Sequence, residues 1–329
     1  MKYLIVGAGA VGAYIGGLMS RAGHDVTLHA RGPHLQAMQQ HGVRIITANE
    51  DFYTNPKVTG DLQTAGTFDV VFLCVKAHGL PGLAPQLPAV IGPETTVVST
   101  QNGIPWWYFQ CENGPLAGTH LERVDPNGVI SAAIPARQIV GSLIYFATEI
   151  IEPGVIKHDE GNRVTLGEPD GSRSERCRAI AEALIASGLR SPITTSIRTE
   201  IWVKLLGNLA FNPISALTGA TLGQMIRDSE VSTLVRNIMQ EAETLAKRLG
   251  MELPISIEQR IAGAAKIGEH KTSMLQDLEA GRPLELEAIT GAVVELAERL
   301  NVPMPNTRAV YACARLMAQQ RSQAAAGKT

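Results

Sequence analysis

The chain has 329 residues, of which 45% are hydrophobic and 18% are charged, and its formal net charge is -2. This length favours two domains, each large enough to bury its own core, and the composition excludes a disordered chain. The 29 Lys and Arg residues nearly balance the 31 Asp and Glu residues, so no chain-wide positive field favours a nucleic-acid partner. The four cysteines lack the paired spacing of a zinc site or a disulfide framework.

Residues 1–20 place one Lys before an apolar stretch, as a secretory signal does. Glycine recurs through this stretch at five positions, a rhythm that the Leu-rich core of a signal peptide does not need: Gly7, Gly9, Gly12, Gly16 and Gly17. No other segment reaches the roughly 18 apolar residues of a membrane span. We therefore expect a cytoplasmic protein that does not associate with membranes.

Short β-branched runs alternate with helical patterns in the first half of the chain. The predicted strands are Lys2–Val6, Asp25–Ala30, Val70–Val75 and Thr96–Thr100. Their continuous apolar character indicates burial on both faces of a parallel sheet. Two of them run into loops that carry Lys76 and Asn102. In an open α/β sheet, ligands bind at this carboxyl edge.

The pattern changes along the second half. Ser142–Ile151 and Gly154–Gly167 are predicted as paired β segments. After Ser174 the chain is nearly all helical, with predicted helices at Glu175–Ser187, Thr199–Asn212, Leu222–Leu249, Ile255–Ile267 and Leu284–Leu300. A change in composition near residues 190–198 predicts one domain at 1–195 and a second, all-α domain at 196–329.

A glycine-rich loop joins the first strand to a helix: Gly7, Ala8, Gly9, Ala10, Val11 and Gly12. In this context the spacing predicts dinucleotide binding. Gly7 permits the tight turn, Gly9 lets the backbone approach a pyrophosphate, and Gly12 allows close packing of helix on strand. The helix N-terminus offers free N–H groups to the anion. The alternative is a tight turn without a ligand.

The second strand ends in Leu28-His29-Ala30-Arg31, where a protein specific for NAD usually has an acid that binds the ribose 2′-hydroxyl. The planar guanidinium of Arg31 can instead pair with a 2′-phosphate. The sequence therefore predicts NADP(H) as the cofactor. The alternative is that Arg31 is an ordinary surface residue.

A polar stripe runs through an otherwise apolar helix. Lys204, Asn208 and Asn212 are spaced by four, which places them on one helical face. Buried ammonium and amide groups are unfavourable unless something satisfies them, so we predict a cleft that holds a polar ligand. A Lys there can protonate an alkoxide as hydride reaches a carbonyl carbon. The alternative is a stripe facing bulk water. Pro213 is expected to end or kink the helix.

Five groups of residues carry a resemblance. They are the glycine loop with Arg31, Val75-Lys76-Ala77, Gln101-Asn102-Gly103, the run from Trp202 through Lys204, Asn208 and Asn212 to Pro213, and Ser273-Met274-Leu275-Gln276-Asp277 followed by Glu285. Together they resemble the ketopantoate reductase (2-dehydropantoate 2-reductase) family over nearly the whole chain. The resemblance implies an α/β Rossmann-type domain with a parallel sheet, followed by a helical domain like the C-terminal domain of 6-phosphogluconate dehydrogenase.

The resemblance also implies an activity: an NADP-dependent oxidoreductase that reduces 2-dehydropantoate to (R)-pantoate, as in pantothenate and coenzyme A biosynthesis, in the cleft between the two domains. Lys204 then donates the proton, and Glu285 orients the substrate and Lys204. The implied substrate contacts are Asn102, Asn208, Asn212 and Ser273, and Arg31, Lys76 and Asn102 serve the cofactor side. Without the resemblance, Ser273 could cap a helix and Glu285 could be a first-turn acid.

Several alternatives stay open. The aromatic run Ile104–Phe109, part of a loop extending to about Pro126, is either a local core or subunit contact, or it reshapes the pocket for a bulkier 2-oxo acid. The enzymatic alternative is a two-domain dehydrogenase of similar build that acts on another 2-oxo acid, a sugar phosphate or an imine. A phosphorylated substrate would need several basic residues beside Lys204, and the stripe offers none. An NADPH-sensing regulatory protein is the non-enzymatic alternative. We expect no metal, and the sequence allows a homodimer.

Overall fold

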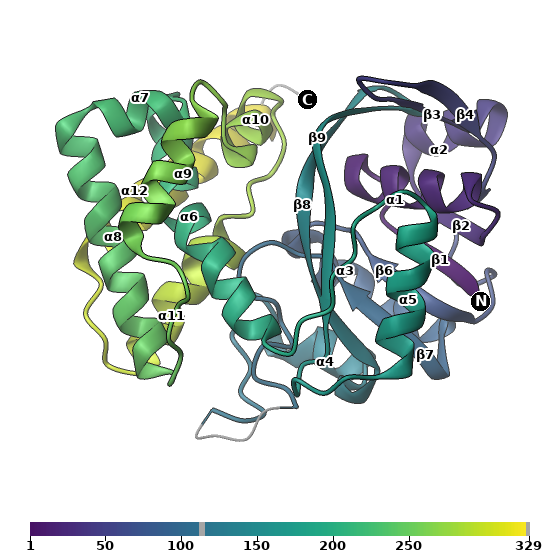
Figure 1. Ribbon diagram of the computed structural model, residues 1–329, viewed down its shortest axis with the longest axis horizontal. Helices are drawn as coiled ribbons and strands as arrows, with labels where there is room; N and C mark the ends of the chain where they lie inside the picture. The colour runs from purple at the N-terminus through teal and green to yellow at the C-terminus, as the bar shows by residue number, and fades with distance from the viewer. Residues whose placement is uncertain (112–115, 327–329) are drawn as a thin grey trace. The chain divides into compact units, whose positions relative to one another are not determined.

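The computed structural model describes residues 1–111 and 116–326, which form two compact units (Figure 1). Unit 1 contains Met1–Gln101, Trp106–His120 and Asp125–Ile197. Unit 2 contains Arg198–Thr329 together with two short segments from the first half of the chain, Asn102–Pro105 and Leu121–Val124. The second unit is therefore assembled from three stretches of the chain.

Unit 1 is built on one twisted sheet, in which the strands of the described residues follow the order β4-β3-β9-β8-β7-β6-β1-β2-β5. The strands are β1 Lys2–Val6, β2 Asp25–His29, β3 Val43–Ile46, β4 Asp51–Thr54, β5 Lys57–Thr59, β6 Phe68–Leu73, β7 Ile91–Ser99, β8 Ile139–Glu152 and β9 Val155–Gly167. All neighbouring pairs are parallel except β3–β4 and β8–β9. The predicted parallel sheet is confirmed, with strand ends shifted by a few residues.

The helices of unit 1 are α1 Ala10–Arg21, α2 Gly32–His41, α3 Leu80–Leu83, α4 Val129–Ala133 and α5 Glu175–Ala186, with 3-10 turns at Ala77–Gly79, Ala84–Ala89, Pro126–Gly128 and Ala136–Gln138. Helices α1 and α5 lie side by side (Figure 1). Ile15 of α1 and Ile180 of α5 share one buried cluster with Ile5 of β1. The main core therefore lies between these helices and one face of the sheet.

Unit 2 is helical. Its elements are α6 Ile197–Thr218, α7 Leu222–Arg227, α8 Ser229–Arg248, α9 Ile257–Ile267, α10 Ser273–Glu279, a π-helical turn at Glu287–Gly291, α11 Ala292–Arg299 and α12 Pro305–Ala326. The predicted all-α second half is confirmed. None of the helices within the described residues is both long enough and apolar enough to cross a membrane.

Two predicted helix boundaries are wrong. Helix α6 does not end at Asn212 but continues through Pro213 to Thr218. Phe211 and Ile214, on either side of the proline, are both 3% exposed, so packing holds the helix together despite the lost backbone donor. The predicted helix 222–249 is two helices, because the Asp228 side chain accepts a hydrogen bond from the Val231 N–H and starts α8.

Candidate active site

The glycine loop after β1 has the local geometry of an anion-binding turn. Gly7 has a φ of +91°, and a Cβ there would lie 2.5 Å from Cγ1 of Val75. A Cβ at Gly12 would lie 2.4 Å from the Gly7 carbonyl oxygen, so neither position accepts a side chain. A Cβ at Gly9, by contrast, would meet nothing within 4 Å. Gly9 is therefore not needed for packing, and it leaves open space beside the start of α1.

No side chain at the N-terminus of α1 competes with a bound anion for the free backbone N–H groups. Its N-cap, Gly9, has no side chain to accept a hydrogen bond, and its first turn contains no acid. The unsatisfied N–H groups and the helix dipole therefore favour a bound anion. A dinucleotide pyrophosphate fits this loop.

Arg31 follows β2 and is exposed as the N-cap residue of α2. Strands β1 and β2 are parallel, with Val6 paired to His29, and the Gly7 and Ala8 N–H groups donate to the His29 carbonyl at 3.2 and 2.8 Å. The glycine loop and the end of β2 therefore share one edge of the sheet. Lys76 is at the same edge, partly buried after β6, which pairs with β1 on its other side.

Lys204, Asn102 and Glu285 form a hydrogen-bonded chain within unit 2. The Lys204 Nζ donates to Asn102 Oδ1 at 2.7 Å, and Asn102 Nδ2 donates to Glu285 Oε2 at 3.2 Å. Because the amide presents its oxygen to a cation and its nitrogen to an anion, the two charges fix its orientation. Glu285 is only 9% exposed, so the carboxylate is held in a largely water-free setting. We call these three residues the Lys204 chain.

The surroundings make the Lys204 ammonium a stronger acid than usual. Burial lowers the pKa of Lys204 from 10.5 to about 8, Glu285 acts to raise it, and Arg260 lowers it further. A general acid works best when its pKa lies near the operating pH. Lys204 therefore remains largely protonated near neutral pH and can still release its proton readily.

The segment 102–105 is fixed against the π-helical turn. Gly103 has a φ of +81°, and a Cβ there would lie 2.2 Å from the Ala288 carbonyl oxygen. That oxygen accepts a hydrogen bond from the Ile104 N–H at 2.9 Å. Glu285 lies just before the turn, and its own carbonyl accepts from Ile289. The close approach that Gly103 permits thus holds Asn102 against Glu285.

The remaining predicted substrate residues differ in their settings. Asn208 is partly buried and Asn212 is 5% exposed, with its Nδ2 lacking a hydrogen-bond partner among the described residues. Ser273 is exposed at the first position of α10. The cap of that helix is Thr272, whose side chain accepts from Leu275, so the alternative interpretation of Ser273 as the cap is wrong.

Comparisons with known proteins assign the chain to a family. Residues 3–171 match the family model described as Ketopantoate reductase PanE/ApbA, and residues 196–318 match Ketopantoate reductase PanE/ApbA C terminal. The chain belongs to the ketopantoate reductase family. Membership indicates an oxidoreductase with a nicotinamide cofactor.

Individual ketopantoate reductases resemble this chain over nearly their whole length. It is 46% identical over 322 residues to a 2-dehydropantoate 2-reductase of Mesorhizobium japonicum, covering 98% of this chain and 99% of that protein. A putative ketopantoate reductase from Ralstonia solanacearum MolK2 has a similar structure, with a TM-score of 0.93, 39% identity and 98% of each chain covered. The 2-dehydropantoate 2-reductase from Methylococcus capsulatus has a TM-score of 0.83, with 30% identity and 98% of each chain covered.

Sequence reasoning missed Arg260, which α9 brings to the face of α6 that carries Lys204. A Cβ at Gly207 would lie 2.2 Å from the Arg260 Nη2, so the guanidinium occupies the space beside that glycine. The prediction found no further basic residue on the Lys204 stripe, and it did not consider a basic residue from another helix. The only signal in the sequence was a glycine inside a helix, which often has a packing reason.

The aromatic run after Asn102 is a local core of unit 1. Trp106, Trp107, Tyr108 and Phe109 are each at most 3% exposed within the single chain. A Cβ at Gly141 of β8 would lie 2.7 Å from Trp107, so the indole packs directly on the sheet. Burial within one chain excludes the subunit-contact interpretation of these rings. Residues 112–115 of the predicted insertion lie outside the described residues.

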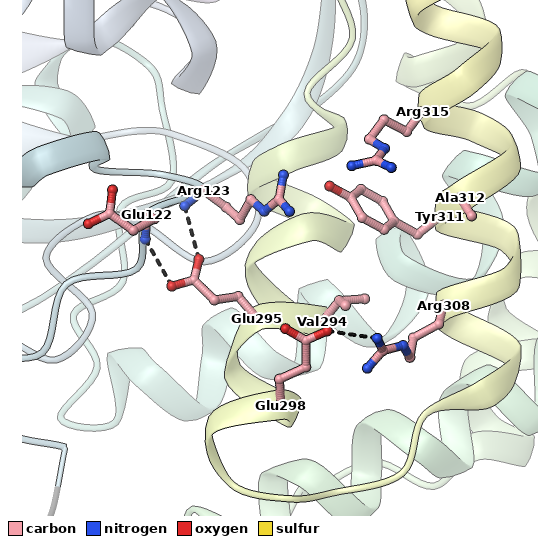
Figure 2. A pocket seen from close by; sticks show the side chains of 9 residues that line it. All are labelled: Glu122, Arg123, Val294, Glu295, Glu298, Arg308, Tyr311, Ala312 and Arg315. Carbon is pink, nitrogen blue, oxygen red and sulfur yellow. Dashed lines mark hydrogen bonds and ion pairs between the residues drawn. The ribbon is translucent and has the colours of Figure 1, made fainter.

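A separate cavity of about 570 Å³ lies in unit 2, lined by Glu122, Arg123, Val294, Glu295, Glu298, Arg308, Tyr311, Ala312 and Arg315 (Figure 2). Arg308 pairs with Glu298 at 2.8 Å, and the Glu295 carboxylate accepts hydrogen bonds from the backbone N–H groups of residues 122 and 123. The Tyr311 hydroxyl donates to Glu287 at 2.8 Å. None of the predicted site residues lines this cavity. The hydrogen bond from Tyr311 links the cavity to the π-helical turn, which begins at Glu287.

Proposed function

We propose that this protein reduces 2-dehydropantoate to (R)-pantoate with NADPH. The observation that carries the proposal is the Lys204 chain, in which a partly buried ammonium of lowered pKa is hydrogen-bonded through Asn102 toward Glu285. A reductase of 2-oxo acids needs such a group, because the carbonyl oxygen must receive a proton when the carbonyl carbon receives hydride.

The proposed reaction is a simple addition. When bound, the reduced nicotinamide supplies the hydride that bonds to C2 of the substrate and breaks the C=O π bond. Lys204 donates one proton to the resulting alkoxide oxygen and is left as a neutral amine, which regains a proton from solvent. Glu285 and Asn102 hold the ammonium in place, and the negative charge of Glu285 favours its protonated form.

Several residues of unit 1 support the choice of a phosphorylated dinucleotide. The glycine loop and the uncapped start of α1 suit a pyrophosphate, and the exposed Arg31 at the end of β2 suits a 2′-phosphate. The neighbouring acid, Asp61, acts on His29, but its carboxylate already accepts hydrogen bonds from Gln63 and Thr64. These hydrogen bonds within its own loop partly satisfy the Asp61 carboxylate.

The proposal is tested by following NADPH absorbance with a small panel of 2-oxo acids. We expect 2-dehydropantoate to give the highest kcat/KM and (R)-pantoate to be the product by chiral chromatography. A higher kcat/KM for a bulkier 2-oxo acid would replace the substrate but keep the chemistry. NADPH that binds and is oxidised by no member of the panel would favour the sensor alternative and overturn the proposed reaction.

A further inference from the structure

Helix α6 contains a glycine on the same face as its essential polar residues. Gly207 lies three residues after Lys204 and one before Asn208, and residues three apart on a helix have Cβ positions only about 5–6 Å apart. Glycine within a helix is less favourable than alanine, so its presence indicates a packing or functional reason. The missing side chain opens a space on the face that carries Lys204.

The guanidinium of Arg260 fills that space. A Cβ at Gly207 would lie 2.2 Å from Nη2, 2.5 Å from Nε and 2.7 Å from Cζ of Arg260, so the planar group lies directly over the glycine backbone. Even alanine at position 207 would displace it. The absence of a side chain at Gly207 therefore allows the Arg260 guanidinium to lie beside the face of α6 that carries Lys204.

Two neighbouring cations repel each other, and an anion that lies near both offsets this repulsion. Arg260 contributes to the lowered pKa of the Lys204 ammonium, of which burial is the largest cause. Glu285 raises this pKa by more than Arg260 lowers it, and it lies on the side of Lys204 that Asn102 occupies. A negatively charged ligand that touches both Lys204 and Arg260 would interact favourably with each of the two cations.

We propose that Arg260 binds the carboxylate of the 2-oxo acid while Lys204 faces the adjacent carbonyl oxygen. This inference rests on the proposed function and names a residue that determines substrate specificity within it. In a 2-oxo acid the carboxylate carbon is bonded directly to the carbonyl carbon, so one small molecule presents both groups side by side. The planar guanidinium can hold the two carboxylate oxygens with two parallel hydrogen bonds.

The proposal has a consequence for specificity. A carbonyl compound without the carboxylate cannot form the proposed ion pair with Arg260. Sites built to hydrogen-bond a charged group discriminate strongly against analogues that lack it. We therefore expect the enzyme to prefer a 2-oxo acid over its neutral methyl ester, and Arg260 to be the source of that preference.

The decisive experiment compares 2-dehydropantoate with its methyl ester in the wild type and in Arg260→Gln. A charge-assisted hydrogen bond contributes about 1.5–3 kcal/mol, so kcat/KM for the acid should fall about 10- to 100-fold while kcat/KM for the ester stays close to that of the wild type. The acid-to-ester ratio should therefore fall by the same factor. Arg260→Lys, which keeps the charge but not the fork, should give an intermediate ratio.

Two further variants separate binding from folding. Gly207→Ala keeps every charge but displaces the guanidinium, so it should lower the acid-to-ester ratio as Arg260→Gln does. Lys266→Gln removes an exposed positive charge from the same helix, α9, and should leave the ratio unchanged. Equal losses for acid and ester in both site variants would mean that Arg260 is merely structural, and an unchanged ratio would also overturn the proposal.

The outcome is distinguishable from a failure of the proposed function. If the wild type ignores 2-dehydropantoate but reduces another 2-oxo acid in an Arg260-dependent way, the substrate is wrong and the carboxylate site stands. If the wild type reduces 2-dehydropantoate and Arg260→Gln keeps its acid-to-ester ratio, the function stands and the carboxylate site is wrong. Calorimetric binding of pantoate, which should weaken in Arg260→Gln, gives a readout that does not depend on turnover.

Discussion

At the scale of single residues, the account depends on how burial and two neighbouring charges set the pKa of the Lys204 ammonium. Burial lowers the pKa of Lys204 most, Glu285 raises it, and Arg260 lowers it, with a result of about 8. Asn102 is neutral, so its hydrogen bonds to Lys204 and Glu285 fix the positions of these side chains without adding a charge. The dependence of kcat/KM on pH should therefore report the protonation state of Lys204.

The reduction should lose activity as the pH rises through about 8, because Lys204 then loses the proton that it must donate. Glu285→Gln removes the influence that raises this pKa, so the midpoint of kcat/KM against pH should move to lower pH. Arg260→Gln removes one that lowers it, so the midpoint should move to higher pH. Profiles of kcat/KM from pH 6 to 10 measure both shifts, and shifts in the same direction would contradict the assignment.

Cofactor preference also belongs to this scale. Arg31→Ala should raise the KM for NADPH by about 10- to 100-fold, because a charge-assisted contact to the 2′-phosphate is lost. The KM for NADH, which lacks that phosphate, should change little. Equal effects on the two cofactors would show that Arg31 contributes to the fold or to a shared part of the dinucleotide instead.

At the scale of elements, the position of Asn102 depends on a close approach between two backbones. Gly103→Ala would place a Cβ 2.2 Å from the Ala288 oxygen and would strain a residue whose φ is +81°. The 102–105 segment must then move off the π-helical turn. A displacement of about 1 Å in a catalytic group lowers activity about 100-fold, and we expect that loss in kcat/KM.

The matched control for this change is Gly219→Ala. Gly219 also has a positive φ, +73°, but a Cβ there would meet nothing within 4 Å. It should lower the thermal midpoint through backbone strain alone and leave kcat/KM unchanged. Loss of activity in proportion to lost stability in both variants would argue against a special role for Gly103.

The regular elements were largely predictable from the sequence, and their boundaries were not. Strand β1 has the predicted bounds Lys2–Val6, because the apolar run Tyr3–Val6 is buried as expected for a strand covered on both faces of the sheet. Helix α6 passes through Pro213 because its neighbours are buried, which no local propensity reports. Asp228 is a residue type that commonly caps helices. Because the apolar periodicity continues across it, the sequence pattern did not indicate the break between α7 and α8.

At the scale of the whole molecule, the candidate site joins distant parts of the chain. Asn102 is 102 residues from Lys204 and 183 residues from Glu285, and it belongs to the second unit although the residue before it belongs to the first. Periodicity predicted the Lys204 face, and the resemblance supplied Asn102 and Glu285. Arg260 could be found by neither route, since only the fold places it over Gly207.

The most direct test of the central claim is a comparison of turnover with cofactor binding in Lys204→Ala. If Lys204 is the proton donor, kcat for 2-dehydropantoate should fall by about 10²–10⁴-fold while the dissociation constant of NADPH, measured by fluorescence, stays close to the wild-type value. A kcat that is nearly unchanged, or a parallel loss of NADPH binding and thermal stability, would contradict the account.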